Sequence, residues 1–147
     1  MSAEENYPVR VSIGQEGFLT TIQAGVHQLI ADEPKSLGGS DKGPNPYDYL
    51  LSSLGACTVI TMRMYATRKE WPLEGVEVQL RHSKDYYKDC MDCEATSAKV
   101  DIIERRIQLK GDLDEQQIKR LMKIADKCPV HKTLTPQIII KTTRIEK

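Results

Sequence analysis

The sequence has few aromatic residues, no excess of charge of either sign and no long apolar stretch. Only one Phe and one Trp occur among the 147 residues, so the core must consist mainly of aliphatic side chains. Lys and Arg together number 21, as do Asp and Glu together. Because nucleic-acid surfaces and polybasic membrane anchors need an excess of basic residues, this balance argues against both classes. No segment approaches the roughly 20 consecutive apolar residues that a membrane-spanning helix requires.

The first residues are polar and acidic and lack the features of a secretory signal peptide. We therefore expect a cytoplasmic protein, in a compartment where thiols are normally kept reduced. In that setting, the four cysteines indicate catalysis, metal binding or packing more than structural disulfides. The length fits one domain over residues 1–147, with a core large enough to need no covalent cross-link.

Hydrophobic periodicity predicts six strands and two helices. We expect strands where apolar and polar residues alternate or β-branched residues gather, at 9–13, 18–24, 27–32, 76–80, 99–109 and 137–142. One helix is expected to begin at the capping residue Asn45 and to fray near Trp71, and the other to begin at Asp114. The order β-β-β-α-β-β-α-β favours an α+β domain over a doubly wound parallel sheet.

The first predicted helix is apolar or small on nearly all sides between Tyr49 and Met64. A helix of this kind is buried, and one small sheet cannot cover it. We therefore expect a partner subunit to complete its cover, which predicts a homodimer. The spacing places one stripe of the helix at Leu50, Leu54, Cys57, Thr61 and Met64.

Two cysteines lie where the predicted helices meet the core. Cys57 falls within the first helix, and Cys128 follows the second helix and precedes Pro129. Both could be small hydrophobic residues of the core, which is a common role of free cysteine. If the two sulfurs meet, they could instead act as a nucleophile and its resolving partner. A Cys-Pro pair at the start of a helical turn would direct the thiol at free backbone N–H groups.

The segments around these cysteines resemble two motifs of the OsmC/Ohr family of organic hydroperoxide reductases. One motif is Gly43-Pro44-Asn45-Pro46 with a helix whose small residues end in Gly55-Ala56-Cys57, and the other is Cys128-Pro129-Val130. The order of the elements is similar as well, so the resemblance spans nearly the whole chain. It implies an OsmC-like α+β fold in an intertwined homodimer, with two central helices packed against sheets and active sites at the subunit interface.

The resemblance also implies a thiol peroxidase that needs no cofactor. Cys57 would attack an organic hydroperoxide, release an alcohol and become a sulfenic acid. Cys128 would then condense with the sulfenic acid to form a disulfide. A dithiol reductant, such as a lipoyl protein, would reduce that disulfide and restore both thiols.

The chain departs from these reductases at the groups that activate the first cysteine. The reductases pair an Arg of the N-terminal half with a Glu ten residues before that cysteine. Here that position is Tyr47, an acid follows at Asp48, and no Arg occurs between Arg10 and Arg63. In this respect the chain is similar to the YhfA-like branch of the family. Asp48 could serve simply as an acidic residue in the first turn of the helix.

Three side chains are candidates to replace the missing cation: His27, His131 and Arg10. We rank His27 first because it lies just upstream of the Gly-Pro loop, although it could equally be a polar residue at a strand edge. His131 follows Cys128 by three residues, so it could share a helical face with the thiol or face solvent.

A second pair of thiols, Cys90 and Cys93, lies eight or more residues after His82. These three residues have part of the spacing of a structural zinc site, which needs four ligands. The pair could instead form a labile disulfide or lie in an inert polar loop.

Two further functions remain open beside the peroxidase. Without the Arg/Glu pair, the protein could be a non-enzymatic module that binds a small ligand. It could also be a redox sensor in which oxidation of Cys57 and Cys128 changes the binding of a partner.

Overall fold

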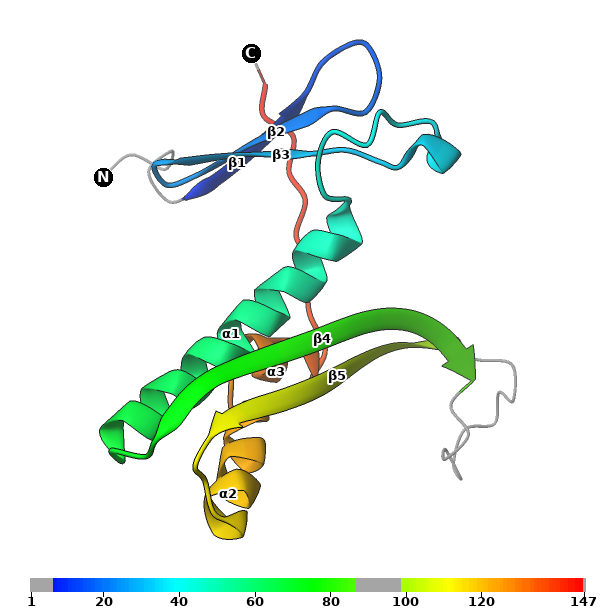
Figure 1. Ribbon diagram of the computed structural model, residues 1–147. Helices are drawn as coiled ribbons and strands as arrows, with labels where there is room; N and C mark the ends of the chain where they lie inside the picture. The colour runs from blue at the N-terminus through cyan, green and yellow to red at the C-terminus, as the bar shows by residue number, and fades with distance from the viewer. Residues whose placement is uncertain (1–6, 87–98, 147) are drawn as a thin grey trace. The chain divides into compact units, whose positions relative to one another are not determined.

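The structure is a computed structural model that describes residues 7–86 and 99–146. The chain divides into two compact units, Met1–Leu50 and Leu51–Lys147. Each unit has its own antiparallel sheet, as Figure 1 shows. Helices and small sheets together confirm the predicted α+β class. The expectation of a single domain stays a prediction.

The N-terminal unit holds a three-stranded sheet in the order β1 (Val9–Ile13), β2 (Thr20–Ala24) and β3 (His27–Ala31). A two-residue turn joins β2 to β3, and Gly25 in this turn has a φ of 61°, which glycine adopts without steric cost.

The register of this sheet sorts its side chains onto two unlike faces. One row pairs Val11 with Ile22 and Ile22 with Leu29, and the next row pairs Arg10 with Gln23 and Gln23 with Gln28. Because successive side chains of a strand point to opposite faces, one face is apolar and the other polar.

The C-terminal unit is built on a long ribbon of two strands, β4 (Leu73–Tyr86) and β5 (Lys99–Gly111), seen in Figure 1. Its helices are α1 (Pro46–Arg68), which begins in the N-terminal unit, α2 (Glu115–Ala125) and the short α3 (Pro129–Leu134). The core joins α1, α2 and β4 through Met62, Ala66, Leu73, Leu121, Ile124 and Ala125. None of the described helices is both long and apolar enough to cross a membrane.

Both long helices begin at the predicted capping residues. The side chain of Asn45 accepts from Asp48 N at 2.8 Å, and the Asp48 carboxylate accepts from Asn45 N at 3.1 Å. Asp114 and Gln117 form the same reciprocal pair, at 2.7 and 3.0 Å. These bonds satisfy backbone donors that a helix leaves free at its start.

The predicted closing strand at 137–142 is wrong, because residues 137–146 form neither helix nor strand. The isoleucines of this segment are exposed, and Ile140 is 84% accessible. A β-branched run supplies strand propensity, but a strand forms only where another strand offers its backbone groups. No described strand pairs with this segment.

The predicted stripe on α1 is correct only in part: Leu54 is buried, and Cys57 and Thr61 are half-buried. Its members Leu50 and Met64 are exposed, whereas the residues buried at four-residue spacing are Leu54, Thr58, Met62 and Ala66. The helix is apolar or small nearly all round, so its sequence carries little information about which side faces the core.

A buried carboxylate fixes the loop between β3 and α1. Asp32 accepts from the backbone N–H groups of Glu33 at 2.8 Å, Lys42 at 3.2 Å and Ser40 at 3.4 Å. Its own backbone N–H donates to Pro44 O at 3.1 Å. Burial raises the pKa of the Asp32 carboxyl, but these backbone donors and the charge of Lys42 outweigh it and hold the pKa below its ordinary value.

The core of the C-terminal unit gives a direct test of packing. Leu121 is fully buried and the neighbouring Met122 is 41% exposed. We expect Leu121→Ala to lower the free energy of unfolding by about 2–5 kcal/mol, because it leaves a cavity. Met122→Ala, the matched control, should cost about 1 kcal/mol or less. Urea denaturation at one fixed protein concentration measures both, and equal losses would contradict this core.

The Asp32 cluster predicts a dependence of stability on pH. A carboxyl whose pKa is lowered by folding stabilises the protein above its unfolded pKa, and this contribution disappears as the pH falls through the folded pKa. We therefore expect Asp32→Asn to be less stable than the native protein at pH 7, with the difference shrinking below about pH 4. Urea denaturation at pH 7 and pH 3 measures this. Asp41→Asn, which removes an exposed carboxylate of the same loop, is the control. A difference that does not change with pH would contradict the assignment.

Candidate functional site

Cys128 is fully buried and caps the N-terminus of α3. Its sulfur accepts from the backbone N–H of His131 at 3.3 Å. Pro129 occupies the first helical turn, where its lack of an N–H costs nothing. This is the arrangement that the Cys-Pro pair predicted.

Cys57 lies in α1 and is half-buried. The next residue, Thr58, is buried, and its hydroxyl oxygen lies 3.8 Å from the sulfur of Cys128. Both cysteines are free thiols. Cys128 thus contacts α1 at the residue that follows Cys57.

Arg105, on β5, is the cation of this site. Its side chain is 12% exposed. One guanidinium nitrogen, Nη1, donates to Thr58 Oγ1 at 2.9 Å and to Ala125 O at 3.1 Å. The other, Nη2, lies 3.0 Å from a carboxylate oxygen of Asp126 and 2.8 Å from Nδ1 of His131. One side chain thereby connects α1, the end of α2, and α3.

The hydrogen bonds assign the protons of the site. A guanidinium can only donate, so Nδ1 of His131 accepts from Arg105, and a neutral ring then carries its proton on Nε2. The Thr58 hydroxyl donates to Leu54 O at 2.7 Å and accepts from Arg105. Its proton is therefore committed, and in the thiol form it is the S–H of Cys128 that points to Thr58. His131 contacts the site twice: its backbone N–H donates to the Cys128 sulfur, and its ring accepts from Arg105.

Sequence reasoning missed Arg105, although the strand pattern contains a signal for it. Its neighbours at two-residue spacing, Ile103 and Ile107, are apolar and partly buried, whereas the intervening Glu104 and Arg106 are exposed. Arg105 is therefore a charged residue on the inward face of a strand. Such a position requires partners inside the protein, and that requirement identifies it as a residue of interest.

The other predicted supporting residues lie in the N-terminal unit. His27 is exposed in β3 opposite Ala24, and Arg10 lies in β1. Tyr47 and Asp48 belong to the first turn of α1, where Asp48 serves as the partner of the cap. Since both cysteines belong to the C-terminal unit, the roles of these residues beside Cys57 stay predictions.

The possible zinc site is only partly covered by the structure. His82 lies in β4, and its Nε2 is 2.8 Å from a carboxylate oxygen of Asp101. Cys90 and Cys93 lie outside the described residues. Within 7–86 and 99–146, no group of three or more ligating side chains could hold a metal ion. A zinc ion at these residues stays a prediction.

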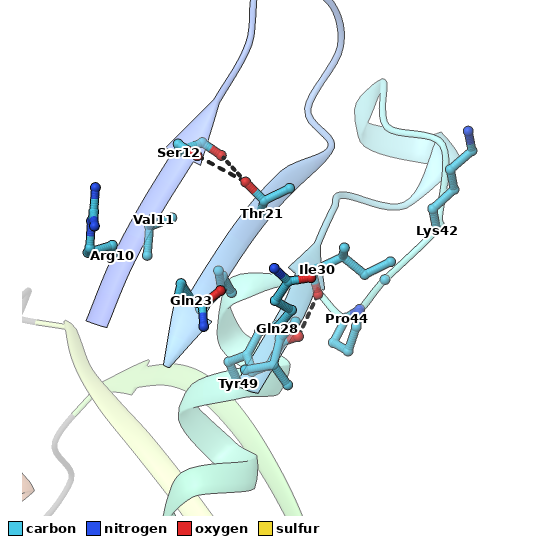
Figure 2. Close-up of a pocket in the computed structure, with 13 residues that line it drawn as sticks. Arg10, Val11, Ser12, Thr21, Gln23, Gln28, Ile30, Lys42, Pro44 and Tyr49 are labelled. Carbon is cyan, nitrogen blue, oxygen red and sulfur yellow. Dashed lines mark hydrogen bonds between the residues drawn. The ribbon is translucent and has the colours of Figure 1, made fainter. Parts of the chain in front are cut away.

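The N-terminal unit contains a hollow of about 1010 Å³ over the polar face of its sheet. Figure 2 shows Arg10 and Lys42 at its edges, with the Gln23 and Gln28 amides between them. The residues that line it include no carboxylate and no thiol. At the wall of this hollow, the loop that contains Gly43 packs closely against β3. A Cβ added at Gly43 would lie 2.9 Å from the backbone oxygen of Ile30. The lining suits a polar or anionic group rather than sulfur chemistry.

Comparisons with known proteins identify the family of this chain. The model of the OsmC-like protein family matches residues 39–143, which include both cysteines and Arg105. No curated protein sequence matches the chain significantly.

Solved structures share the fold at low sequence identity. An OsmC-like protein from Mycoplasma pneumoniae is 21% identical with a TM-score of 0.69, over 88% of this chain and 86% of its own. A protein of Psychrobacter arcticus is 20% identical with a TM-score of 0.69, over 88% of both chains. An organic hydroperoxide resistance protein OsmC from Legionella pneumophila is 18% identical with a TM-score of 0.62, over 88% of this chain and 90% of its own. Because the family model covers most of the sequence and these structures share its fold, the chain belongs to the OsmC-like protein family.

Proposed function

We propose that the protein is a thiol-dependent peroxidase that reduces organic hydroperoxides to alcohols. The observation that carries the proposal is the contact of the Cys128 sulfur with Thr58, the residue that follows Cys57. The family supports it, since the similar Legionella pneumophila structure is that of an organic hydroperoxide resistance protein.

The exposure of the two thiols suggests how they divide the reaction. Cys57 is half-buried and so can meet a substrate, whereas Cys128 is fully buried. The Cys57 thiolate attacks one peroxide oxygen, the O–O bond breaks, and the alkoxide leaves as an alcohol after it takes up a proton. The resulting sulfenic acid condenses with Cys128, forming a disulfide and releasing water. A dithiol, such as a lipoyl protein, then restores both thiols. No resident cofactor enters these steps.

A homodimer in the cytoplasm is part of the same proposal. The apolar face of the N-terminal sheet carries exposed residues, among them Val9, Val11 and Ile13. The segment with Ile138, Ile139 and Ile140 is exposed as well. Apolar surface of this extent is typical of an interface. A reducing compartment would keep the two free thiols ready for reaction.

The second candidate function is a non-enzymatic module that binds a small ligand or senses oxidation. The hollow lined by Arg10 and Lys42 favours ligand binding, because it offers two cations and two side-chain amides but no thiol. Tyr47 in place of the acid of the reductases points in the same direction.

Replacement of each cysteine tests the peroxidase. Cys57→Ser should reduce steady-state consumption of cumene hydroperoxide with dihydrolipoamide to the uncatalysed background, because the nucleophile is gone. Cys128→Ser should still react with one equivalent of peroxide and should accumulate the sulfenic acid, which mass spectrometry detects. The double variant Cys90→Ser/Cys93→Ser is the control and should keep its activity.

Three further results distinguish the peroxidase from the alternatives. Native protein that consumes no more peroxide than Cys57→Ser refutes the peroxidase. A reversible Cys57–Cys128 disulfide without turnover would indicate a sensor. Ligand binding that survives in both single variants would indicate the binding module.

A further inference from the structure

Arg105 binds the two residues that contact a buried thiol, although the sequence lacks the Arg/Glu pair expected near Cys57. We infer that Arg105 is a positioning residue for Cys128. It holds the two residues that contact the sulfur, so that Cys128 departs as a thiolate when its disulfide is reduced at Cys57. This inference rests on the proposed peroxidase cycle. The stabilisation of the Cys128 thiolate can be tested without that cycle.

The four contacts of Arg105 all surround Cys128. The Thr58 hydroxyl and the His131 backbone N–H contact the sulfur, and Arg105 binds the Thr58 hydroxyl at 2.9 Å and the His131 ring at 2.8 Å. Ala125 O and Asp126, its remaining partners, lie three and two residues before Cys128. Because a guanidinium is a rigid planar fork, it fixes all these groups in one geometry.

The local charge favours a negative sulfur. The titratable groups that hydrogen-bond around Cys128 are Arg105, Asp126 and His131. The Asp126 side chain is 69% exposed, so water screens its charge, whereas the Arg105 side chain is 12% exposed. A neutral His131 adds no charge. The buried sulfur therefore shares Thr58 and His131 with a cation that solvent screens only weakly, and this charge offsets part of the cost of burying a thiolate.

Thr58 can respond to the charge of the sulfur without moving its oxygen. In the thiol form its hydroxyl donates to Leu54 O. When Cys128 becomes a thiolate, rotation about the C–O bond redirects that proton to the sulfur, while Arg105 keeps the oxygen in place. The thiolate then accepts from the Thr58 hydroxyl and from the His131 N–H, and charge-assisted hydrogen bonds of this kind are strong.

Burial sets the direction of the reduction step. Since Cys128 is fully buried and Cys57 is not, a thiolate of the reductant attacks the Cys57 sulfur. The Cys57–Cys128 bond breaks, and its electron pair passes to Cys128, which leaves as a thiolate and later takes up a proton. The second thiol of the reductant then displaces Cys57 from the mixed disulfide, leaving the reductant oxidised. Exchange is faster when the leaving thiolate is more stable, so Arg105 promotes this step.

A titration of Cys128 alone tests the first half of the inference. In a Cys57→Ser/Cys90→Ser/Cys93→Ser background, the absorbance at 240 nm reports the thiolate of Cys128. We expect Arg105→Gln to raise the pH midpoint of this signal by about one unit, and Arg105→Lys to restore part of the shift. Arg106→Gln, which removes the exposed arginine next in sequence, is the control and should leave the midpoint in place. Equal midpoints for Arg105→Gln and Arg106→Gln would refute the inference even in a working peroxidase.

Reduction of the oxidised protein tests the second half. We expect Arg105→Gln to slow reduction by dihydrolipoamide roughly threefold or more, with Arg106→Gln unchanged. Under 2-mercaptoethanol, mass spectrometry should find the mixed disulfide on Cys57. An adduct on Cys128, or equal rates in the two variants, would overturn the proposed direction. Thermal unfolding of each variant separates a loss of fold from a loss of thiolate stabilisation, and Arg105→Lys gives a second, charge-preserving comparison.

Discussion

The hydrogen bonds of Arg105 determine how the C-terminal unit is organised around a buried sulfur. A cation on the inner face of a strand must find acceptors, since an unpaired buried charge is far more costly than a paired one. Arg105 finds them on three separate elements, in Thr58, Ala125 O, Asp126 and His131. The requirement to satisfy one guanidinium therefore fixes the distance between α1 and the turn that contains Cys128. The position of the Cys128 sulfur relative to α1 follows from that electrostatic constraint.

The same arrangement explains how a family fold can lack an expected ion pair and still offer a charged environment to a thiol. The resemblance implies an Arg/Glu pair near Cys57, and this chain has Tyr47 at the acidic position. An arginine and an acid are nevertheless paired in the C-terminal unit, where Arg105 meets Asp126 at 3.0 Å. Asp126 of this pair lies two residues before Cys128. In the proposed cycle, a cation at that place would act on the departure of a thiolate, whereas one beside Cys57 would act on the attack.

Local signals in the sequence predicted a large part of the structure, and long-range ones failed. Asn45 and Asp114 identified the helix starts because a cap involves residues only three positions apart. The Cys128-Pro129 pair predicted a sulfur directed at backbone N–H groups for the same reason. Arg105 was missed because its partners lie 20 to 47 residues away and become neighbours only in the fold. The strand at 137–142 was wrong because strand propensity does not supply a strand to pair with.

The residues that flank the unpaired segment at 137–142 limit its tendency to aggregate. Three consecutive isoleucines, Ile138 to Ile140, in solvent form a template on which like segments can stack into fibrils. Pro136 precedes the run and Lys141 follows it. A proline lacks one donor of the ladder, and a lysine repels its copies in a stack, so both act as gatekeepers against fibril growth. The solubility of the exposed isoleucines then depends on two flanking residues that take no part in the chemistry of sulfur.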